Sequence, residues 1–175
     1  ITKNTGGASI YPGTKILFWD TNSSSWEKEW DLNAANIVSI KKVGSVLYAL
    51  TSTGLFAFNY DTAPVKVLDF GITDLTASIS ATIGAHYSMD RFGDGVIWGD
   101  TLGRLHFYGK AVAGATNAYH QLFSVPSGTA TMVVGSVSEN LVIAGTTTPK
   151  LGHYDIESGT PDTGVSATSV FIDLQ

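Results

Sequence analysis

The clearest pattern of hydrophobic and polar positions in this chain is one short strand that occurs four times. Each copy places two large side chains two residues apart, which puts both on one face of a β-strand. In successive copies the first of these is Ile16, Phe56, Leu105 and Leu151. The second is Phe18, Phe58, Phe107 and His153. The copies begin 40, 49 and 46 residues apart, which indicates an internal repeat.

Further short apolar segments lie around each copy at regular places. Strands directly before the copies are expected at 45–50, 95–99 and 141–145. Each joins its copy through a short turn with Gly or Pro, as in a β-hairpin. Earlier strands are expected at 37–40, 77–82 and 130–134, and outer strands ending at positions 32, 70, 125 and 174. The repeat therefore predicts a four-stranded antiparallel unit.

Repeats of this length made only of short strands indicate an all-β β-propeller, with one four-stranded blade per repeat. Residues 1–12 are expected to form an N-terminal segment and residues 13–175 the propeller segment. Within the latter, 13–32 supplies half a blade, and the full blades are 36–70, 75–125 and 129–174. Closed propellers have at least about four blades, so about three and a half predict part of a larger propeller. The alternative is a four-bladed ring closed by the first and last strands.

Composition supports this fold and excludes several functions. Hydrophobic residues make up 43% of the 175 positions and charged residues 14%, which suits strands that are buried on both faces. The net charge of −5 argues against nucleic-acid binding, which needs a basic surface. No apolar run is long enough for a transmembrane helix, so no membrane insertion is expected. With no cysteine, the chain has no disulfide, catalytic thiol or thiolate metal site.

The histidines and the recurring aspartates have simple structural explanations. No two of the histidines have the spacing of paired metal ligands; they are His86, His106, His120 and His153. Of these, His106 and His153 lie within expected strands and are interpreted as packing residues. Aspartates recur just after the repeated strand, where a carboxylate accepts N–H groups of a turn; they are Asp20, Asp61 and Asp155.

The remaining acidic residues leave glycosidase chemistry as an alternative, because it needs two carboxylates in one pocket. The candidates are Asp74, Asp90, Asp94 and Asp100. Residues 90–95 superficially suggest a calcium loop, but lack the acidic alternation and final Glu of an EF-hand, so a hairpin turn is expected. No nucleophile, phosphate-loop or dinucleotide motif is present. We therefore expect no catalytic, cofactor-binding or metal site.

Two features indicate where a partner could bind. Most tryptophans and tyrosines lie in expected strands and are interpreted as core, whereas Trp26 follows a polar turn and is expected to be partly exposed. The long loops 85–95, 109–118 and 156–167 would all lie on one face of a propeller. Length variation on one face is typical of binding loops, although tolerated insertions explain it equally well.

Some residues resemble known propeller families. Phe18-Trp19-Asp20 is similar to the end of a WD repeat, and Tyr154-Asp155 is a weaker match, but the Gly-His pair of WD repeats is missing. The segment 19–26 looks like a kelch-type strand and turn without the kelch glycine pair. The Gly/Ser/Thr/Ala-rich composition, with few charges, resembles propeller domains of bacteriophage tail and virion proteins.

This last resemblance implies a non-catalytic structural or protein-interaction module in a phage or virus-like virion or tail assembly. Its partners would be other proteins or further copies of the chain, and its location a virion. The alternatives are a secreted or surface propeller that binds glycans and, next, a propeller glycosidase or lyase. Exposed aromatic side chains or converging carboxylates would favour these two.

Overall fold

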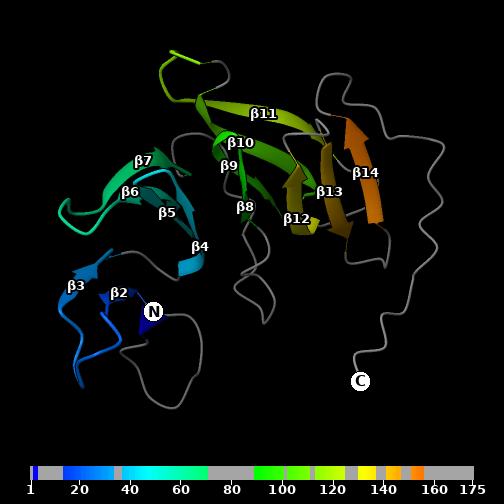
Figure 1. Ribbon diagram of the computed structural model, residues 1–175. Coiled ribbons are helices and arrows are strands. Elements are labelled where there is room, and N and C mark those ends of the chain that lie inside the picture. The colour runs from blue at the N-terminus through cyan, green and yellow to red at the C-terminus, as the bar shows by residue number, and fades with distance from the viewer. Residues whose placement is uncertain are drawn as a thin grey trace.

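The computed structural model describes residues 2–3, 14–33, 37–70, 89–100, 102–110, 113–124, 130–136, 141–146 and 151–155. These residues form fourteen strands in four antiparallel sheets and contain no helix (Figure 1). Within this part of the chain the all-β prediction is confirmed. The same residues include no helix long and apolar enough to cross a membrane.

Each sheet is built from strands that follow one another in the sequence. The first sheet contains β1 (Thr2–Lys3), β2 (Lys15–Phe18) and β3 (Lys28–Asp31). The second contains β4 (Ile37–Val43), β5 (Val46–Thr51), β6 (Gly54–Phe58) and β7 (Val65–Asp69). The third contains β8 (Met89–Phe92), β9 (Asp94–Gly99), β10 (Arg104–Lys110) and β11 (Ala118–Ser124). The fourth contains β12 (Ala130–Ser136), β13 (Leu141–Thr146) and β14 (Leu151–Asp155).

Short turns with suitable residues explain why neighbouring strands pair in chain order. Gly44 joins β4 to β5 with φ 59°, and Gly93 joins β8 to β9 with φ 54°. Such positive φ values cost glycine little, because it has no Cβ. In the β5–β6 turn, the Thr51 hydroxyl oxygen accepts the N–H of Gly54 at 3.0 Å and donates to its carbonyl at 2.8 Å. Local chemistry therefore fixes these hairpins.

The second sheet buries both of its faces, because alternate side chains of a strand point in opposite directions. On one face, Ala49 of β5 packs with Ile16 and Leu32 of the first sheet. On the other, Leu50 packs with Met89 and Trp98 of the third sheet. The core therefore lies between successive sheets.

The inner strands β4, β8 and β12 bring the last three sheets together. Strand β8 lies beside both β4 and β12. A Cβ on Gly135 of β12 would lie 2.7 Å from the Phe92 ring of β8, so this close approach requires glycine. Four-stranded sheets in sequence order, packed face to face, are compatible with an arrangement of propeller blades.

The predicted repeat is confirmed at its anchor residues. All eight lie in β2, β6, β10 and β14, and the last three of these are each the third strand of their sheet in chain order. Where side chains are described, the first anchors are buried: Ile16, Phe56 and Leu105. Pairs of large side chains two positions apart therefore identified equivalent strands correctly, although the units differ in length.

Two details differ from the sequence expectation. Thr2–Lys3, within the segment expected to precede the propeller, pairs with β2, so the first sheet has three strands instead of two. The strand beside β9 is Met89–Phe92, because Asp90 pairs with Ile97 in a hairpin that turns at Gly93. The predicted hairpin turn over 90–95 is thus confirmed. The long loop predicted over 85–95 is wrong for 89–95, because these residues form β8, the turn at Gly93 and the start of β9.

Other predicted segments lie outside the described residues. These are the strand at 77–82, the loop at 156–167 and the outer strand that ends at position 174. The predicted connection between the third and fourth strands of the third unit is confirmed, since β10 ends at Lys110 and β11 begins at Ala118.

Candidate functional site

The tight turn between β9 and β10 is organised by one buried carboxylate. Oδ1 of Asp100 accepts the backbone N–H groups of Leu102 and Arg104, both at 2.9 Å. The backbone of Asp100 also bonds Arg104, with its N–H donating to the Arg104 carbonyl at 3.0 Å. Gly103 adopts φ 77°, which permits this turn. Asp100 is only 3% exposed, so the turn is anchored inside the protein.

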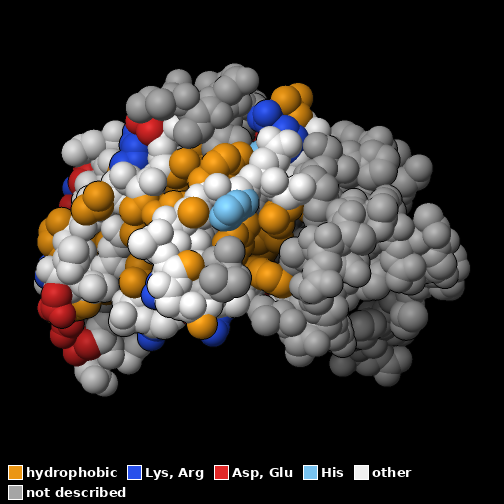
Figure 2. Space-filling view, turned by 90° about the horizontal axis from the view of Figure 1, so that it is seen from above, with side chains coloured by type: hydrophobic (Ala, Val, Ile, Leu, Met, Phe, Trp, Pro, Cys, Tyr) orange, Lys and Arg blue, Asp and Glu red, His pale blue; other side chains and the backbone are white. Residues whose placement is uncertain are grey.

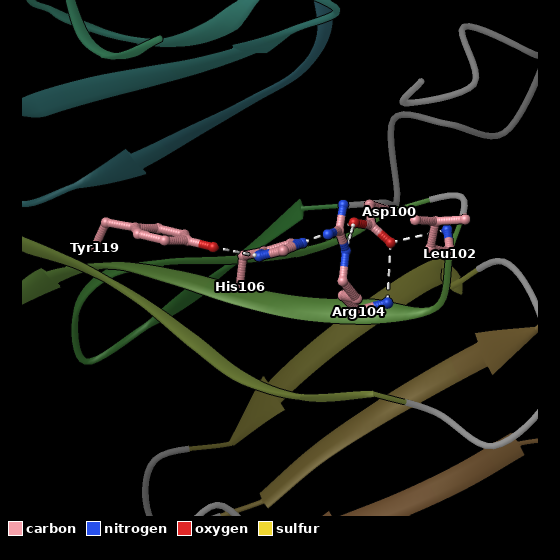
Figure 3. A network of polar contacts seen from close by, with 5 residues as sticks. All are labelled: Asp100, Leu102, Arg104, His106 and Tyr119. Carbon is pink, nitrogen blue, oxygen red and sulfur yellow. Dashed lines mark hydrogen bonds and ion pairs between the residues drawn. The ribbon is translucent and has the colours of Figure 1, made fainter. Parts of the chain in front are cut away.

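The second carboxylate oxygen of Asp100 extends the contacts into the sheet (Figure 3). Oδ2 accepts Nε–H of Arg104 at 2.6 Å and lies 3.0 Å from Nε2 of His106. Nδ1 of His106 lies 3.0 Å from the hydroxyl oxygen of Tyr119 on β11. The imidazole also stacks on the rings of Trp98 and Tyr119, with centroids 5.4 and 5.9 Å away. A single polar network therefore joins the β9–β10 turn to β10 and β11.

Hydrogen bonding fixes how protons are distributed in this network. Burial alone would raise the pKa of Asp100, but hydrogen bonds from His106 and Arg104 lower it to about 2. The ionised carboxylate can only accept, so Nε2 of His106 carries a proton and donates it. On the other side of the ring, Nδ1 of His106 shares a hydrogen bond with the Tyr119 hydroxyl. Burial raises the pKa of Tyr119 above its ordinary value.

A hydroxyl, an imidazole and a carboxylate in line also occur where an enzyme activates a nucleophile. Here the imidazole of His106 is 0% exposed, and both of its nitrogens are engaged within the sheet. The pKa of Tyr119 moves upward, opposite to that of an activated nucleophile. The geometry therefore suits holding a turn and two strands together. It agrees with the structural role expected for His106, while the convergence with Asp100 escaped sequence reasoning.

The most prominent surface feature is a group of three half-exposed aromatic side chains. Trp19 and Trp26 are each 48% exposed and Tyr60 is 44% exposed, and we call these three residues the aromatic surface. The two tryptophans lie in the β2–β3 turn, and Tyr60 lies in the β6–β7 turn. The predicted partial exposure of Trp26 is confirmed, whereas the exposure of Trp19 was missed because it continues a strand pattern.

Contacts between the two turns hold the aromatic surface together. The ring of Phe18, which precedes Trp19, lies 5.3 Å from the ring of Tyr60. The Tyr60 hydroxyl donates to the carboxylate of Glu27, which follows Trp26, at 3.4 Å. The N–H of Glu27 donates to the carbonyl of Phe18 at 2.8 Å. These contacts join the β2–β3 turn, which carries Trp19 and Trp26, to the β6–β7 turn, which carries Tyr60.

Side-chain hydrogen bonds order the β2–β3 turn. Oδ1 of Asp20 accepts the N–H groups of Asn22 at 2.9 Å and Ser23 at 3.0 Å, which lowers the pKa of Asp20. The indole N–H of Trp19 donates to the Ser23 carbonyl at 2.6 Å and fixes the ring. The predicted turn role of Asp20 is confirmed.

The equivalent role in the β6–β7 turn was predicted for the wrong residue. Oδ1 of Asn59 accepts the N–H groups of Asp61 at 2.8 Å and Thr62 at 2.6 Å. Asn59 and Asp61 are two residues apart, and an amide oxygen accepts turn N–H groups as a carboxylate does. The side chain of Asp155 lies outside the described residues.

Asp90 forms a second polar junction, between sheets. Oδ1 of Asp90 on β8 lies 3.2 Å from Nζ of Lys41 on β4. Oδ2 accepts the N–H of Gly135 on β12 at 3.2 Å. One carboxylate therefore links the inner strands of three successive sheets. Sequence reasoning missed this role, because nothing in the local pattern shows which strands become neighbours.

The other candidates do not converge on a site among the described residues. His120 is exposed, and its ring stacks at 6.3 Å on Phe107. Asp94 is exposed at the β8–β9 turn. His86, Asp74 and the side chain of His153 lie outside the described part of the chain. Over the residues that the structure describes, no group of three or more His, Cys, Asp or Glu side chains could hold a metal ion.

No protein-family model and no curated protein matches the chain.

Proposed function

We propose that this protein is a non-catalytic structural or protein-interaction module whose partners are other proteins or further copies of the chain. The observation that carries the proposal is the enclosure of the acid–base network around His106 in the part of the chain that the structure describes. His106 has no exposed surface, so a substrate could not reach it. The aromatic surface, by contrast, is open to solvent, and tryptophan and tyrosine are favoured residues at protein interfaces.

The proposal includes the finer fold, a β-propeller of four-stranded blades of which this chain supplies a part. Three features support it: meandering sheets in chain order, cores between successive sheets, and inner strands that approach one another. A run of blades leaves a sheet face at each end that must be covered. Association with another chain or another copy would cover these faces.

The setting we propose is a phage or virus-like virion or tail assembly. It rests on the resemblance of the composition and of the degenerate repeat to propeller domains of such proteins. A structural role in a particle agrees with a chain whose conspicuous polar residues hold turns and sheets together, as Asp100 and Asp90 do.

Analytical ultracentrifugation of the 175-residue chain over a range of concentrations tests the proposal. We expect concentration-dependent association that is abolished when residues 111–117, between β10 and β11, are replaced by a short turn. The matched control is Ser52→Ala in the short β5–β6 turn of the second sheet. Circular dichroism checks that both variants fold. A monomer at every concentration would contradict association with further copies of the chain, and association unchanged by the shorter loop would contradict the role of that loop.

A further inference from the structure

We propose that the aromatic surface binds a basic peptide segment of a partner protein, with arginine or lysine side chains stacked on Trp19 and Trp26. The inference rests on the proposed function, since it names the chemistry of the partner. It is carried by three observations: exposed rings held in place, an internal cation already seated on neighbouring rings, and surrounding acidic residues.

Trp19 and Tyr60 are held in place before any partner arrives. Hydrogen bonds within the β2–β3 turn, including that from the Trp19 indole to Ser23, hold its shape. Tyr60 is fixed from the next sheet by contacts with Phe18 and Glu27. Binding to rigid rings avoids the entropic cost of ordering them, which favours affinity.

The chain itself shows that rings of this region accept a cation. The ammonium group of Lys28 lies 4.6 Å from the ring centroid of Trp30 and 4.8 Å from that of Tyr60. Both distances lie within the range of a cation–π interaction. Trp19 and Trp26 each keep about half of their surface exposed for a cation from outside.

Acidic residues make the same region attractive to a basic segment. Asp20, Glu27 and Asp61 lie in the two turns and are exposed. The pKa of Tyr60 is raised, mainly by the negative charge of Glu27. Burial, the hydrogen bond to Glu27 and the charge of Asp61 raise it further. In the view from above, acidic side chains gather at the left edge of the described surface beside hydrophobic ones (Figure 2). Carboxylates beside exposed rings complement a guanidinium or ammonium group in both charge and shape.

A saccharide would also stack on exposed tryptophans, but a neutral sugar gains nothing from the negative charge around them. The basic peptide is therefore the better match, and a neutral saccharide is the alternative that the experiment separates from it.

The test is a titration of the 175-residue chain with tetra-arginine, followed by NMR of the tryptophan indole N–H groups and by calorimetry. We expect the Trp19 and Trp26 signals to shift while that of buried Trp98 stays in place. Binding should weaken as salt is added, since surface charge pairs are screened. Replacing both exposed tryptophans by alanine should weaken binding by roughly tenfold or more.

Matched variants separate this inference from general effects. Leu102→Ala removes another exposed hydrophobic side chain, 63% exposed in the β9–β10 turn, and should leave binding unchanged. Glu27→Gln keeps the rings and should weaken binding a fewfold, so the test remains decisive if the double tryptophan variant fails to fold. Absence of tetra-arginine binding, or binding unaffected by either change, would overturn the inference. Binding of cellotetraose in place of tetra-arginine would overturn it in favour of a saccharide site.

The inference and the proposed function fail in different ways. If the chain associates in the ultracentrifuge but does not bind tetra-arginine, the basic partner is wrong and the interaction module stands. If the chain neither associates nor binds the peptide, both the basic partner and the association with further copies are wrong.

Discussion

Replacing Asp100 by asparagine is the sharpest test of the polar network in the third sheet. The amide keeps one oxygen for the turn N–H groups but cannot accept from both Arg104 and His106 as the carboxylate does. Breaking a buried charge pair typically costs about 3–5 kcal/mol, and Arg104 can turn partly toward water because its side chain is 20% exposed. We therefore expect the free energy of unfolding at neutral pH to fall by about 2–4 kcal/mol.

The pH dependence of stability provides an independent measure of how much Asp100 contributes to the free energy of unfolding. A pKa lowered from 3.8 to about 2 corresponds to roughly 2.5 kcal/mol of stability. The folded-state pKa of Asp100 lies below that of the unfolded chain, so this contribution is present above about pH 5 and is lost as the pH falls toward 2. The difference in stability between the protein and D100N should shrink by about 1 kcal/mol at pH 3 and about 2 kcal/mol at pH 2.

Urea unfolding followed by tryptophan fluorescence at several pH values measures both quantities. Asp69→Asn is the matched control, because Asp69 forms an exposed ion pair with Lys66 that should contribute less than about 1 kcal/mol at any pH. A loss below about 1 kcal/mol for D100N at neutral pH, or a loss that does not change with pH, would refute the role given to the network.

Three further predictions concern individual contacts. Gly95→Ala would place a methyl group 2.4 Å from the carbonyl oxygen of Tyr108. We therefore expect the free energy of unfolding, measured by thermal unfolding, to fall by about 3 kcal/mol or more. A variant as stable as the protein would contradict the close pairing of β9 and β10. Asp90→Ala should speed amide hydrogen exchange at Gly135, because its N–H loses its acceptor, and unchanged exchange would contradict the junction. Tyr119→Phe should lower the free energy of unfolding by about 1 kcal/mol, because Nδ1 of buried His106 loses its hydrogen-bond partner. An increase in stability would contradict this hydrogen bond.

Much of the fold could be predicted because it depends on local pattern. Side chains two residues apart identified β2, β6, β10 and β14, and glycine-containing turns identified hairpins around them. The pairing of Thr2–Lys3 with β2 was missed, because two residues provide too short a pattern to recognise. The strand Met89–Phe92 was missed because Asp90 and Arg91 interrupt its apolar character.

The polar sites were less predictable, because they depend on which strands become neighbours. His106 was correctly assigned to packing, yet its contacts with Asp100 and Tyr119 require the register of three strands. The Asp90 junction requires the packing of three sheets, which no local pattern contains. Exposure of Trp26 was predictable, because it follows a polar turn between two strands of the first unit.

Cysteine cross-linking tests the central claim, that successive sheets converge at their inner strands as propeller blades do. The chain has no cysteine, so any cross-link within it must join the two introduced cysteines. A pair at Lys41 and Asp90 lies on inner strands of neighbouring sheets, and a pair at Lys66 and His120 lies on their outer strands. Blades diverge from the axis toward the rim, so a short cross-linker should join the inner pair and leave the outer pair unlinked. Equal linking of both pairs, or linking of the outer pair alone, would contradict this arrangement.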